Sequence, residues 1–200
     1  LVDRKRPFVE CRWSFFYKRR FMDEAKELVT EKSREKENPI LCYVEKGFLK
    51  YMHSIDWRIS VKYNNRVFAG VVTSINDKKY VIPLTSQTTE ERAKAGKKKR
   101  SALITTFIED GDGEIANLLY NNMFPIQDNI IKTVKIDPLV DTYCANEIRY
   151  IRKKWKDIEE KAKNVYNERY DMGSRNYSFL QRTCCDFKKL EQEYEKYSLK

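Results

Sequence analysis

Two β-branched runs on either side of a short turn constrain the fold of this chain more than any other feature. The first run is RVFAGVVTSI at residues 66–75, and the second is KYVIPLT at residues 79–85. Asn76, Asp77 and Lys78 lie between them, and Asn and Asp favour tight turns because their side chains hydrogen-bond to the nearby backbone. Two such runs around a short connection predict an antiparallel β-hairpin. We therefore expect a sheet built around this hairpin.

The remaining pattern predicts strands first and helices later. A short amphipathic helix is expected after Gly47, because apolar residues recur at helical spacing through residue 59. A longer apolar stripe with the same spacing runs from Val140 to Tyr170 and ends near Gly173. Further strands are predicted in ILCYV (40–44), SALITTF (101–107), IANLLYNNMFPI (115–126) and IIKTVKI (130–136), and one or two short helices in residues 179–197. Antiparallel strands with helices gathered mainly at the C-terminal end belong to the α+β class.

The first 38 residues differ in character from the rest of the chain. Apolar residues at helical spacing in FMDEAKELV (21–29) predict a helix, and polar residues then run to Asn38. The sequence therefore predicts an N-terminal helical extension and linker over residues 1–38 and one main domain over residues 39–200. Within that domain, TTEERAKAGKKKRS (88–101) is predicted to be a polar, basic loop.

The charge balance indicates a polyanionic partner. The chain carries 40 Lys and Arg against 30 Asp and Glu, a net charge of +10. A surplus of this size favours nucleic acid or an anionic membrane face. No apolar run approaches the roughly 18 residues of a membrane span, and the N-terminus lacks the apolar core of a signal peptide. We therefore expect a cytoplasmic protein with no membrane partner.

The cysteines and the single histidine do not suggest a metal site. The five cysteines are scattered, two of them are adjacent, and the sequence has no C-x-x-C spacing. A zinc site needs a closer set of thiolate and imidazole ligands. We expect buried, reduced thiols and no metal or other cofactor.

The hairpin brings one set of polar side chains together. Arg66 begins its first strand, and Thr85 and Ser86 end its second. The start of one antiparallel strand lies beside the end of the other. A guanidinium and two hydroxyls should therefore converge at one end of the hairpin. The basic loop that contains Lys97–Arg100 leaves from the same end.

Such a set of groups could hold an RNA phosphodiester. RNA carries its own nucleophile, the 2′-OH, so an enzyme mainly has to align it with the departing 5′-oxygen. Guanidinium and hydroxyl donors can stabilise the charge that builds on the phosphorus oxygens. The alternative is structural: Thr85 and Ser86 cap a turn, and Arg66 forms a surface ion pair.

Several motifs resemble those of one known family. GFLKYM followed by Asp56, then RVFAGVV, KKYVIPLTS, NNMFPI (121–126) and RTCCDFKKLEQEYEKY (182–197) occur in this order. From about residue 40 to the C-terminus, the chain resembles the ToxN, AbiQ and CptN endoribonuclease toxins of type III toxin–antitoxin systems. The resemblance implies a strongly twisted antiparallel sheet of the MazF/Kid toxin type with surrounding helices.

The resemblance also implies an activity and partners. Members of the family cleave adenine-rich RNA without metal and leave a 2′,3′-cyclic phosphate. A small repeat RNA folded as a pseudoknot inhibits them, in closed rings of two or three protein–RNA pairs. The implied roles are phage abortive infection or plasmid and locus maintenance, with cellular or phage RNA as the substrate.

The family's site residues can be transferred to matching positions here. The implied catalytic residues are Arg66, Thr85 and Ser86. Some members carry a lysine two residues after the serine, where this chain has Thr88, and Lys94 or the Lys97–Arg100 run could supply the missing charge. The residues predicted to bind RNA are Phe48, Lys50, Tyr51, Thr88, Lys94, Lys97, Lys98, Lys99 and Arg100. The Lys97–Arg100 run is included because of its positive charge and its place next to the predicted site.

Two other functional classes remain open from the sequence. A non-catalytic RNA-binding module would use the same basic surface, with the hydroxyls only contacting phosphates. A structural protein that presents a basic face to a membrane has weaker support, because no basic amphipathic helix stands apart from the core. Incubation with labelled RNA in EDTA separates the three classes.

Overall fold

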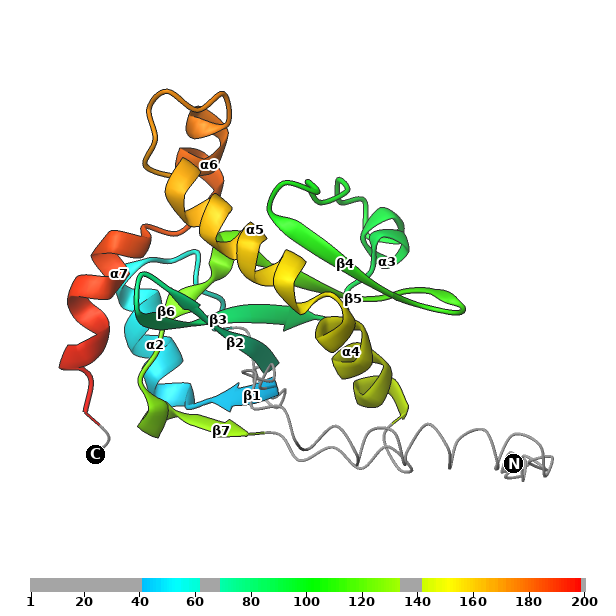
Figure 1. The fold of residues 1–200 in the computed structure, drawn as a ribbon, viewed down its shortest axis with the longest axis horizontal. Helices are drawn as coiled ribbons and strands as arrows, with labels where there is room; N and C mark the ends of the chain where they lie inside the picture. Colours follow the sequence, from blue (N-terminus) through cyan, green and yellow to red (C-terminus); the bar gives the residue numbers. More distant parts are fainter. Residues whose placement is uncertain (1–40, 62–68, 134–141, 199–200) are drawn as a thin grey trace, which may run out of the picture. The chain divides into compact units, whose positions relative to one another are not determined.

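A computed structural model describes residues 41–61, 69–133 and 142–198 of the chain (Figure 1). The strands are β1 (Leu41–Val44), β2 (Ala69–Ile75), β3 (Lys78–Thr85), β4 (Thr105–Asp110), β5 (Gly113–Leu119), β6 (Phe124–Pro125) and β7 (Ile131–Thr133). The helices are α2 (Lys46–Ile55), α3 (Thr89–Lys94), α4 (Thr142–Lys153), α5 (Trp155–Glu168), α6 (Tyr177–Thr183) and α7 (Phe187–Glu193). Helices α4 to α7 all follow the strands, so the predicted α+β class is confirmed.

The central hairpin forms as the sequence predicts. Asn76 and Asp77 have φ values of 50° and 61°, so both occupy the left-handed region that a two-residue hairpin turn requires. The register runs from Ile75 opposite Lys78 to Gly70 opposite Pro83. Gly70 is required by close packing, because a Cβ there would collide with the Val81 side chain on the neighbouring strand.

The sheet is antiparallel and is organised around β3. The strand order is β4-β5-β3-β2-β1-β7, and β6 also pairs with β3. One edge of β3 pairs with β2, and its other edge is divided between two partners. Tyr80 and Val81 pair with β6, whereas Leu84 and Thr85 pair with β5. Beyond Pro83, the end of β3 therefore lies beside β5 of the β4–β5 hairpin.

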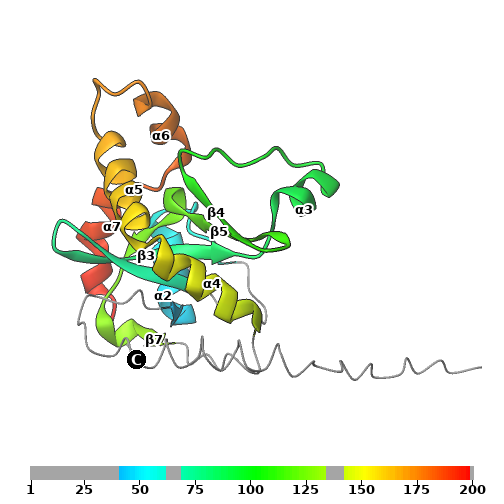
Figure 2. The ribbon, with the colours of Figure 1, turned by 45° about the vertical axis from the view of Figure 1, so that its right-hand side comes forward.

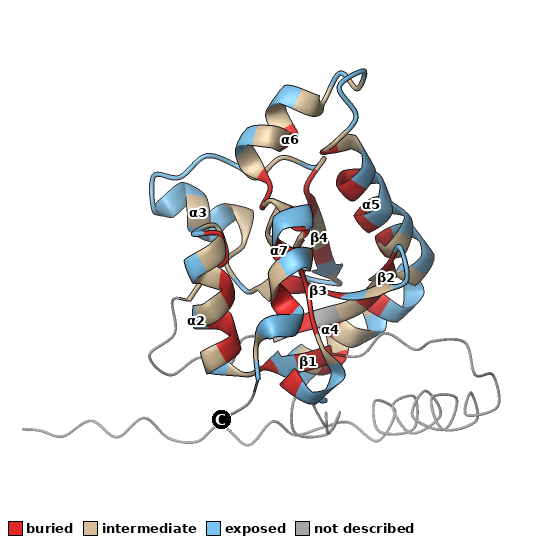
Figure 3. Ribbon diagram, turned by 90° about the vertical axis from the view of Figure 1, so that its left-hand side faces the viewer, coloured by how far each residue is buried: buried red, intermediate tan, exposed pale blue. Residues whose placement is uncertain are grey.

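The helices cover the sheet and build the core. Figure 3 shows buried residues on one side of α2 and α5, and the core includes Phe48, Met52, Ile158 and Phe187. Helix α2 begins at Lys46 because the Glu45 carboxylate accepts hydrogen bonds from the Gly47 and Phe48 N–H groups at 2.8 and 2.6 Å. It ends at residue 55, so the helix predicted through residue 59 is shorter in the structure.

Two further predicted elements differ from the structure. The apolar stripe of residues 140–170 becomes two helices, α4 and α5, which meet at Lys154. The predicted loop 88–101 contains a short helix, α3, whose N-terminus is capped by Thr88. The Thr88 hydroxyl accepts from the Glu91 N–H, and the Glu91 carboxylate accepts from the Thr88 N–H, which forms a capping box.

The extension and linker predicted over residues 1–38 lie outside the described residues. In the described part of the chain, no helix combines the length and the apolar character that are needed to cross a membrane. Among the same residues, no group of three His, Cys, Asp and Glu side chains is placed to hold a metal ion.

Candidate active site

Thr85 and Ser86 lie where β3 ends and the chain turns toward α3. Thr85 is half-buried and pairs with Asn117 of β5, whereas the Ser86 side chain is exposed. The Thr85 hydroxyl accepts a hydrogen bond from the Gln87 N–H at 3.2 Å. Within the described part of the chain, the Ser86 hydroxyl makes no hydrogen bond. The structure therefore presents one free hydroxyl beside one that stabilises the turn.

Gln87, the next residue, is held by donors from three segments. Its backbone carbonyl accepts from Arg100 Nη1 at 2.7 Å and from Asn117 Nδ2 at 3.0 Å. Its side-chain Oε1 accepts from Arg92 Nη1 and Arg100 Nη2, both at 3.3 Å. Arg92 also donates from Nε and Nη2 to the Lys98 carbonyl, at 3.1 and 2.9 Å. These bonds tie α3, the basic loop and β5 to the segment that carries Ser86.

Glu114 provides the negative charge in this network. Its Oε1 accepts from Asn117 Nδ2 and from the Thr89 N–H, each at 2.8 Å. Burial by itself would raise the pKa of the Glu114 carboxyl, but these hydrogen bonds and the Arg100 charge lower the pKa overall. Burial and the charge of the nearby Arg92 lower the pKa of Arg100. The Glu114 carboxylate acts in the other direction and raises it. The site is therefore a partly desolvated cluster with two guanidinium groups and one carboxylate.

The basic residues predicted to bind RNA divide into two groups. Lys97, Lys98 and Lys99 are exposed on the loop after α3, and α3 and α7 lie at opposite ends of the view in Figures 1 and 2. Lys94 is also exposed, but its Nζ forms an ion pair with Glu90 at 2.7 Å on the same helix. Arg100 differs from all of these because it is half-buried against Gln87.

Of the predicted site residues Thr88 and Arg66, the structure describes only Thr88. The Thr88 hydroxyl is used as the cap of α3, so it contributes to the local structure. Arg66 lies outside the described residues. Its convergence with Thr85 and Ser86 therefore stays a prediction.

The prediction that Phe48 contacts RNA is wrong. Its side chain is fully buried, and its ring packs against Phe124 at 6.2 Å and Tyr197 at 5.3 Å between centroids. A base cannot stack on a ring that is covered on all sides. Tyr51 is half-buried, and its hydroxyl donates to the Glu193 carbonyl at 3.1 Å. Of the three residues predicted on α2, only Lys50 is exposed.

Four residues of this network were not predicted from the sequence: Gln87, Arg92, Glu114 and Asn117. The capping box was readable, since T-x-x-E at residues 88–91 signals a helix start. A helix there would have placed Arg92 in its last turn, close to the segment after Ser86. Asn117 gave no such signal, because it lies within an ordinary strand pattern and is fully buried.

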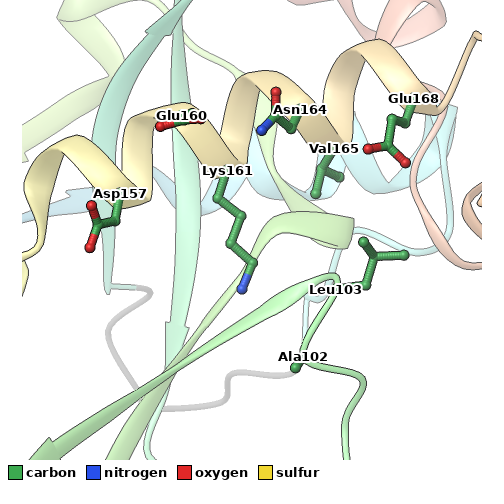
Figure 4. Close-up of a pocket in the computed structure, with 8 residues that line it drawn as sticks. All are labelled: Ala102, Leu103, Asp157, Glu160, Lys161, Asn164, Val165 and Glu168. Atoms are coloured by element: carbon green, nitrogen blue, oxygen red, sulfur yellow. The ribbon is translucent and has the colours of Figure 1, made fainter.

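A cavity of about 420 Å³ lies between α5 and residues 102–103 (Figure 4). Lys161 extends from α5 toward β4, and its Nζ donates to the Thr105 carbonyl at 2.8 Å. Burial lowers the pKa of Lys161. Asp157, Glu160 and Glu168 also line the cavity, and carboxylates disfavour a phosphate backbone. Lys161 therefore fixes the start of β4, and the cavity is a poor RNA site.

Comparison with known proteins agrees with the fold and with the sequence motifs. The family model "Toxin ToxN, type III toxin-antitoxin system" matches residues 40–195. The chain belongs to the ToxN toxin family. Endoribonuclease ToxN of Bacillus thuringiensis subsp. kurstaki is 25% identical over 173 residues, which cover 81% of this chain and 86% of that protein. Endoribonuclease AbiQ of Lactococcus lactis subsp. lactis is 28% identical over 161 residues, which cover 76% and 86%.

Solved structures of ToxN-type toxins share this fold. One comes from work on selective toxin inhibition by a non-coding RNA pseudoknot in type III systems; it matches with a TM-score of 0.70 and 24% identity, over 80% of this chain and 98% of that chain. The structure of AbiQ, described as a lactococcal anti-phage endoribonuclease, matches with a TM-score of 0.66 and 22% identity, over 82% and 99%. The resemblance predicted from the motifs is thus confirmed.

Proposed function

We propose that this chain cleaves RNA through attack by the substrate's own 2′-OH, with Ser86 and Thr85 at the reacting phosphate. As a ToxN family member, the chain is an endoribonuclease toxin of a type III system. The observation that carries the site assignment is the exposed Ser86 hydroxyl, which has no partner among the described residues, on a backbone that is held on both sides. Exposed side chains on rigid segments are suited to substrate positioning.

The proposed reaction is a transesterification. A bond forms between the 2′-oxygen and phosphorus, and the bond from phosphorus to the 5′-oxygen breaks. The 2′-OH loses its proton, the 5′-oxygen leaves as a hydroxyl, and a 2′,3′-cyclic phosphate remains. Alignment of the 2′-OH supplies much of the acceleration, and Ser86, Thr85 and Arg66 are the proposed donors to the phosphorus oxygens.

The proposed partners are RNAs of two kinds. Cellular or phage RNA with adenine-rich sites is the substrate, and a small repeat RNA folded as a pseudoknot is the inhibitor. Support comes from the related solved system, in which a non-coding RNA pseudoknot selectively inhibits the toxin. We place this activity in the cytoplasm, where these RNAs occur, with a role in abortive phage infection or in maintenance of its own locus.

The assembly with the inhibitory RNA is proposed to be a closed ring of two or three protein–RNA pairs. An RNA whose two ends reach different protein molecules closes such a ring without further contacts. Light scattering of the co-expressed complex measures the mass directly. A one-to-one heterodimer would contradict the ring, and toxin that purifies free of RNA would contradict the partnership.

One experiment tests the reaction and its site together. Labelled single-stranded RNA is incubated in EDTA with wild type, with Ser86→Ala and with Ser178→Ala, which removes an exposed serine on α6. We expect cleavage by wild type and Ser178→Ala, and a loss of at least about 100-fold in Ser86→Ala.

The possible failures have different meanings. Full activity of Ser86→Ala would place the chemistry elsewhere. RNA binding by wild type without cleavage in EDTA would contradict metal-independent cleavage, and binding without cleavage when magnesium is also supplied would favour the non-catalytic RNA-binding module.

A further inference from the structure

We propose that Arg100 and Asn117 are positioning residues that hold Ser86 in place by fixing the Gln87 carbonyl. This inference rests on the proposed function, because it assumes that Ser86 acts on the RNA phosphate. It assigns to Arg100 a role different from the RNA contact that the sequence predicted, and it assigns a role to Asn117, which the sequence did not indicate.

Both backbone polar atoms of Gln87 are occupied. Its N–H donates to the Thr85 hydroxyl, and its carbonyl accepts from Arg100 and from Asn117. The peptide groups on both sides of Gln87 are therefore fixed, and Ser86 lies between this fixed residue and the last residue of β3. The Ser86 hydroxyl makes no hydrogen bond in the described part of the chain, so its orientation depends on this backbone.

Asn117 is a rigid anchor for this arrangement. It is fully buried in β5 and lies opposite Thr85 in the strand register. Its Nδ2 donates both to the Gln87 carbonyl and to Glu114 Oε1, so the amide cannot rotate without losing two bonds. Its Oδ1 has no partner among the described residues. Burying the amide oxygen without a hydrogen-bond partner costs free energy. The two hydrogen bonds that Nδ2 donates therefore set the orientation of the amide.

Arg100, on the loop between α3 and β4, donates to the same Gln87 carbonyl. Its two terminal nitrogens contact two different oxygens of Gln87, the backbone carbonyl and the side-chain Oε1. A lysine has one terminal nitrogen and cannot reproduce this planar fork. The guanidinium is half-buried, so it gains more from these fixed acceptors than an exposed lysine on the same loop would.

The positioning role and an RNA-contact role predict different kinetics. Loss of an RNA contact weakens substrate binding, which raises KM. Loss of alignment lowers kcat, because a displacement of about 1 Å at the reacting groups can cost about 100-fold in rate. Arg100→Lys separates the two roles, since it keeps the positive charge for RNA and removes the fork.

The experiment measures kcat and KM for a fluorescent, adenine-rich, single-stranded RNA in EDTA. The variants are Arg100→Lys, Arg100→Gln and Arg175→Ala, the last of which removes an exposed arginine elsewhere. We expect both Arg100 variants to lower kcat by about 10- to 100-fold, with KM for Arg100→Lys within about threefold of wild type. Arg175→Ala should match wild type. Thermal unfolding of each variant verifies that it is folded.

Asn117→Ser tests the role of Asn117, because the shorter serine side chain cannot reach the Gln87 carbonyl as the asparagine amide does. We expect kcat to fall by about 10-fold or more with KM nearly unchanged in the folded protein. If this variant does not fold, the Arg100 pair decides the question alone. An unchanged kcat in Arg100→Lys, or a rise in KM larger than the fall in kcat, would overturn the positioning role.

The two proposals fail in distinguishable ways. Ser86→Ala that cleaves like wild type contradicts the proposed site, whatever Arg100 does. Ser86→Ala that is inactive beside a fully active Arg100→Lys leaves the proposed function in place and removes only the positioning role.

Discussion

The Asp56 carboxylate accepts a hydrogen bond from the Asp186 backbone N–H at 2.8 Å, across 130 residues of the chain. Asp56 is buried, and it also accepts from the Arg58 N–H at 3.0 Å and from the Arg58 guanidinium at 3.2 Å. The Arg58 carbonyl in turn accepts from Asn122 Nδ2 at 2.6 Å, and the Cys185 N–H donates to the Asn121 carbonyl. Three of the motifs that carry the family resemblance therefore meet in one structural junction.

Asp56→Ala should destabilise the domain without altering its chemistry. Removing the carboxylate leaves the Asp186 N–H and the Arg58 guanidinium without their partner, so we expect a loss of about 2–4 kcal/mol in the free energy of unfolding. Urea unfolding measures this loss. The matched control is Asp128→Ala, which removes a surface ion pair with Lys79 (2.6 Å) and should cost about 0–1 kcal/mol. Equal effects of the two changes would contradict the structural role of Asp56.

Phe48→Leu tests whether this ring acts in the core or on RNA. Because the ring is buried against Phe124 and Tyr197, we expect unfolding free energy to fall by about 1–2 kcal/mol, with RNA affinity unchanged. Lys50→Ala, on the exposed side of the same helix, should do the opposite and weaken RNA binding with little effect on stability. Filter binding and urea unfolding measure both quantities. Weaker RNA binding by stably folded Phe48→Leu would restore the original prediction.

The hairpin and the helical region show what the sequence could predict. Asn76 and Asp77 tolerate a left-handed backbone, and β-branched runs flank them, so the hairpin was readable from the sequence. Its register was not, because Lys78 pairs with Ile75 and belongs to β3 rather than to the connection. The break between α4 and α5 was not, because Lys154 is neither glycine nor proline and its N–H still donates to the Tyr150 carbonyl at 3.0 Å. No residue type at the break therefore signals it in the sequence.

Only part of the candidate active site could be predicted from the sequence. Thr85 and Ser86 end a strand whose pattern is local, so their position followed from the sequence. The contact between Gln87 and Asn117 joins residues 30 positions apart and depends on β5 pairing with β3 rather than with another strand. Hydrophobic periodicity does not specify which strand is the neighbour, so this part of the site needed the structure.

Glu114 should make stability depend on acid pH. Its folded-state pKa is lowered, so its contribution is present above its ordinary value of 4.5 and is lost as the pH falls through the folded-state pKa. The difference in unfolding free energy between wild type and Glu114→Gln should therefore be larger at pH 6 than at pH 3. The control Glu160→Gln, an exposed carboxylate on α5, should change stability by less than about 0.5 kcal/mol at either pH. A difference for Glu114→Gln that does not vary with pH would contradict this assignment.

Arg66→Lys tests the residue that the sequence placed beside Ser86. The change keeps the charge but removes the bidentate fork, so cleavage should slow more than RNA binding weakens. Single-turnover cleavage and binding of a non-cleavable, 2′-deoxy-substituted RNA give the two numbers. An equal fall in both would make Arg66 a binding residue rather than a donor to the reacting phosphate.

The buried cysteines Cys42, Cys184 and Cys185 should resist thiol reagents in the folded protein. Burial raises the pKa of Cys42 to about 12 and of Cys184 to about 11, and the pKa of Cys185 is also well above its ordinary value. The thiolate is the reactive form, and a rise of two pKa units lowers the thiolate fraction about 100-fold at neutral pH. Labelling with iodoacetamide at pH 8, located by mass spectrometry, should therefore modify these three residues slowly in buffer and rapidly in urea. Rapid labelling of Cys184 or Cys185 in the native protein would mean that the junction around Asp56 and Asp186 opens on the timescale of the reaction.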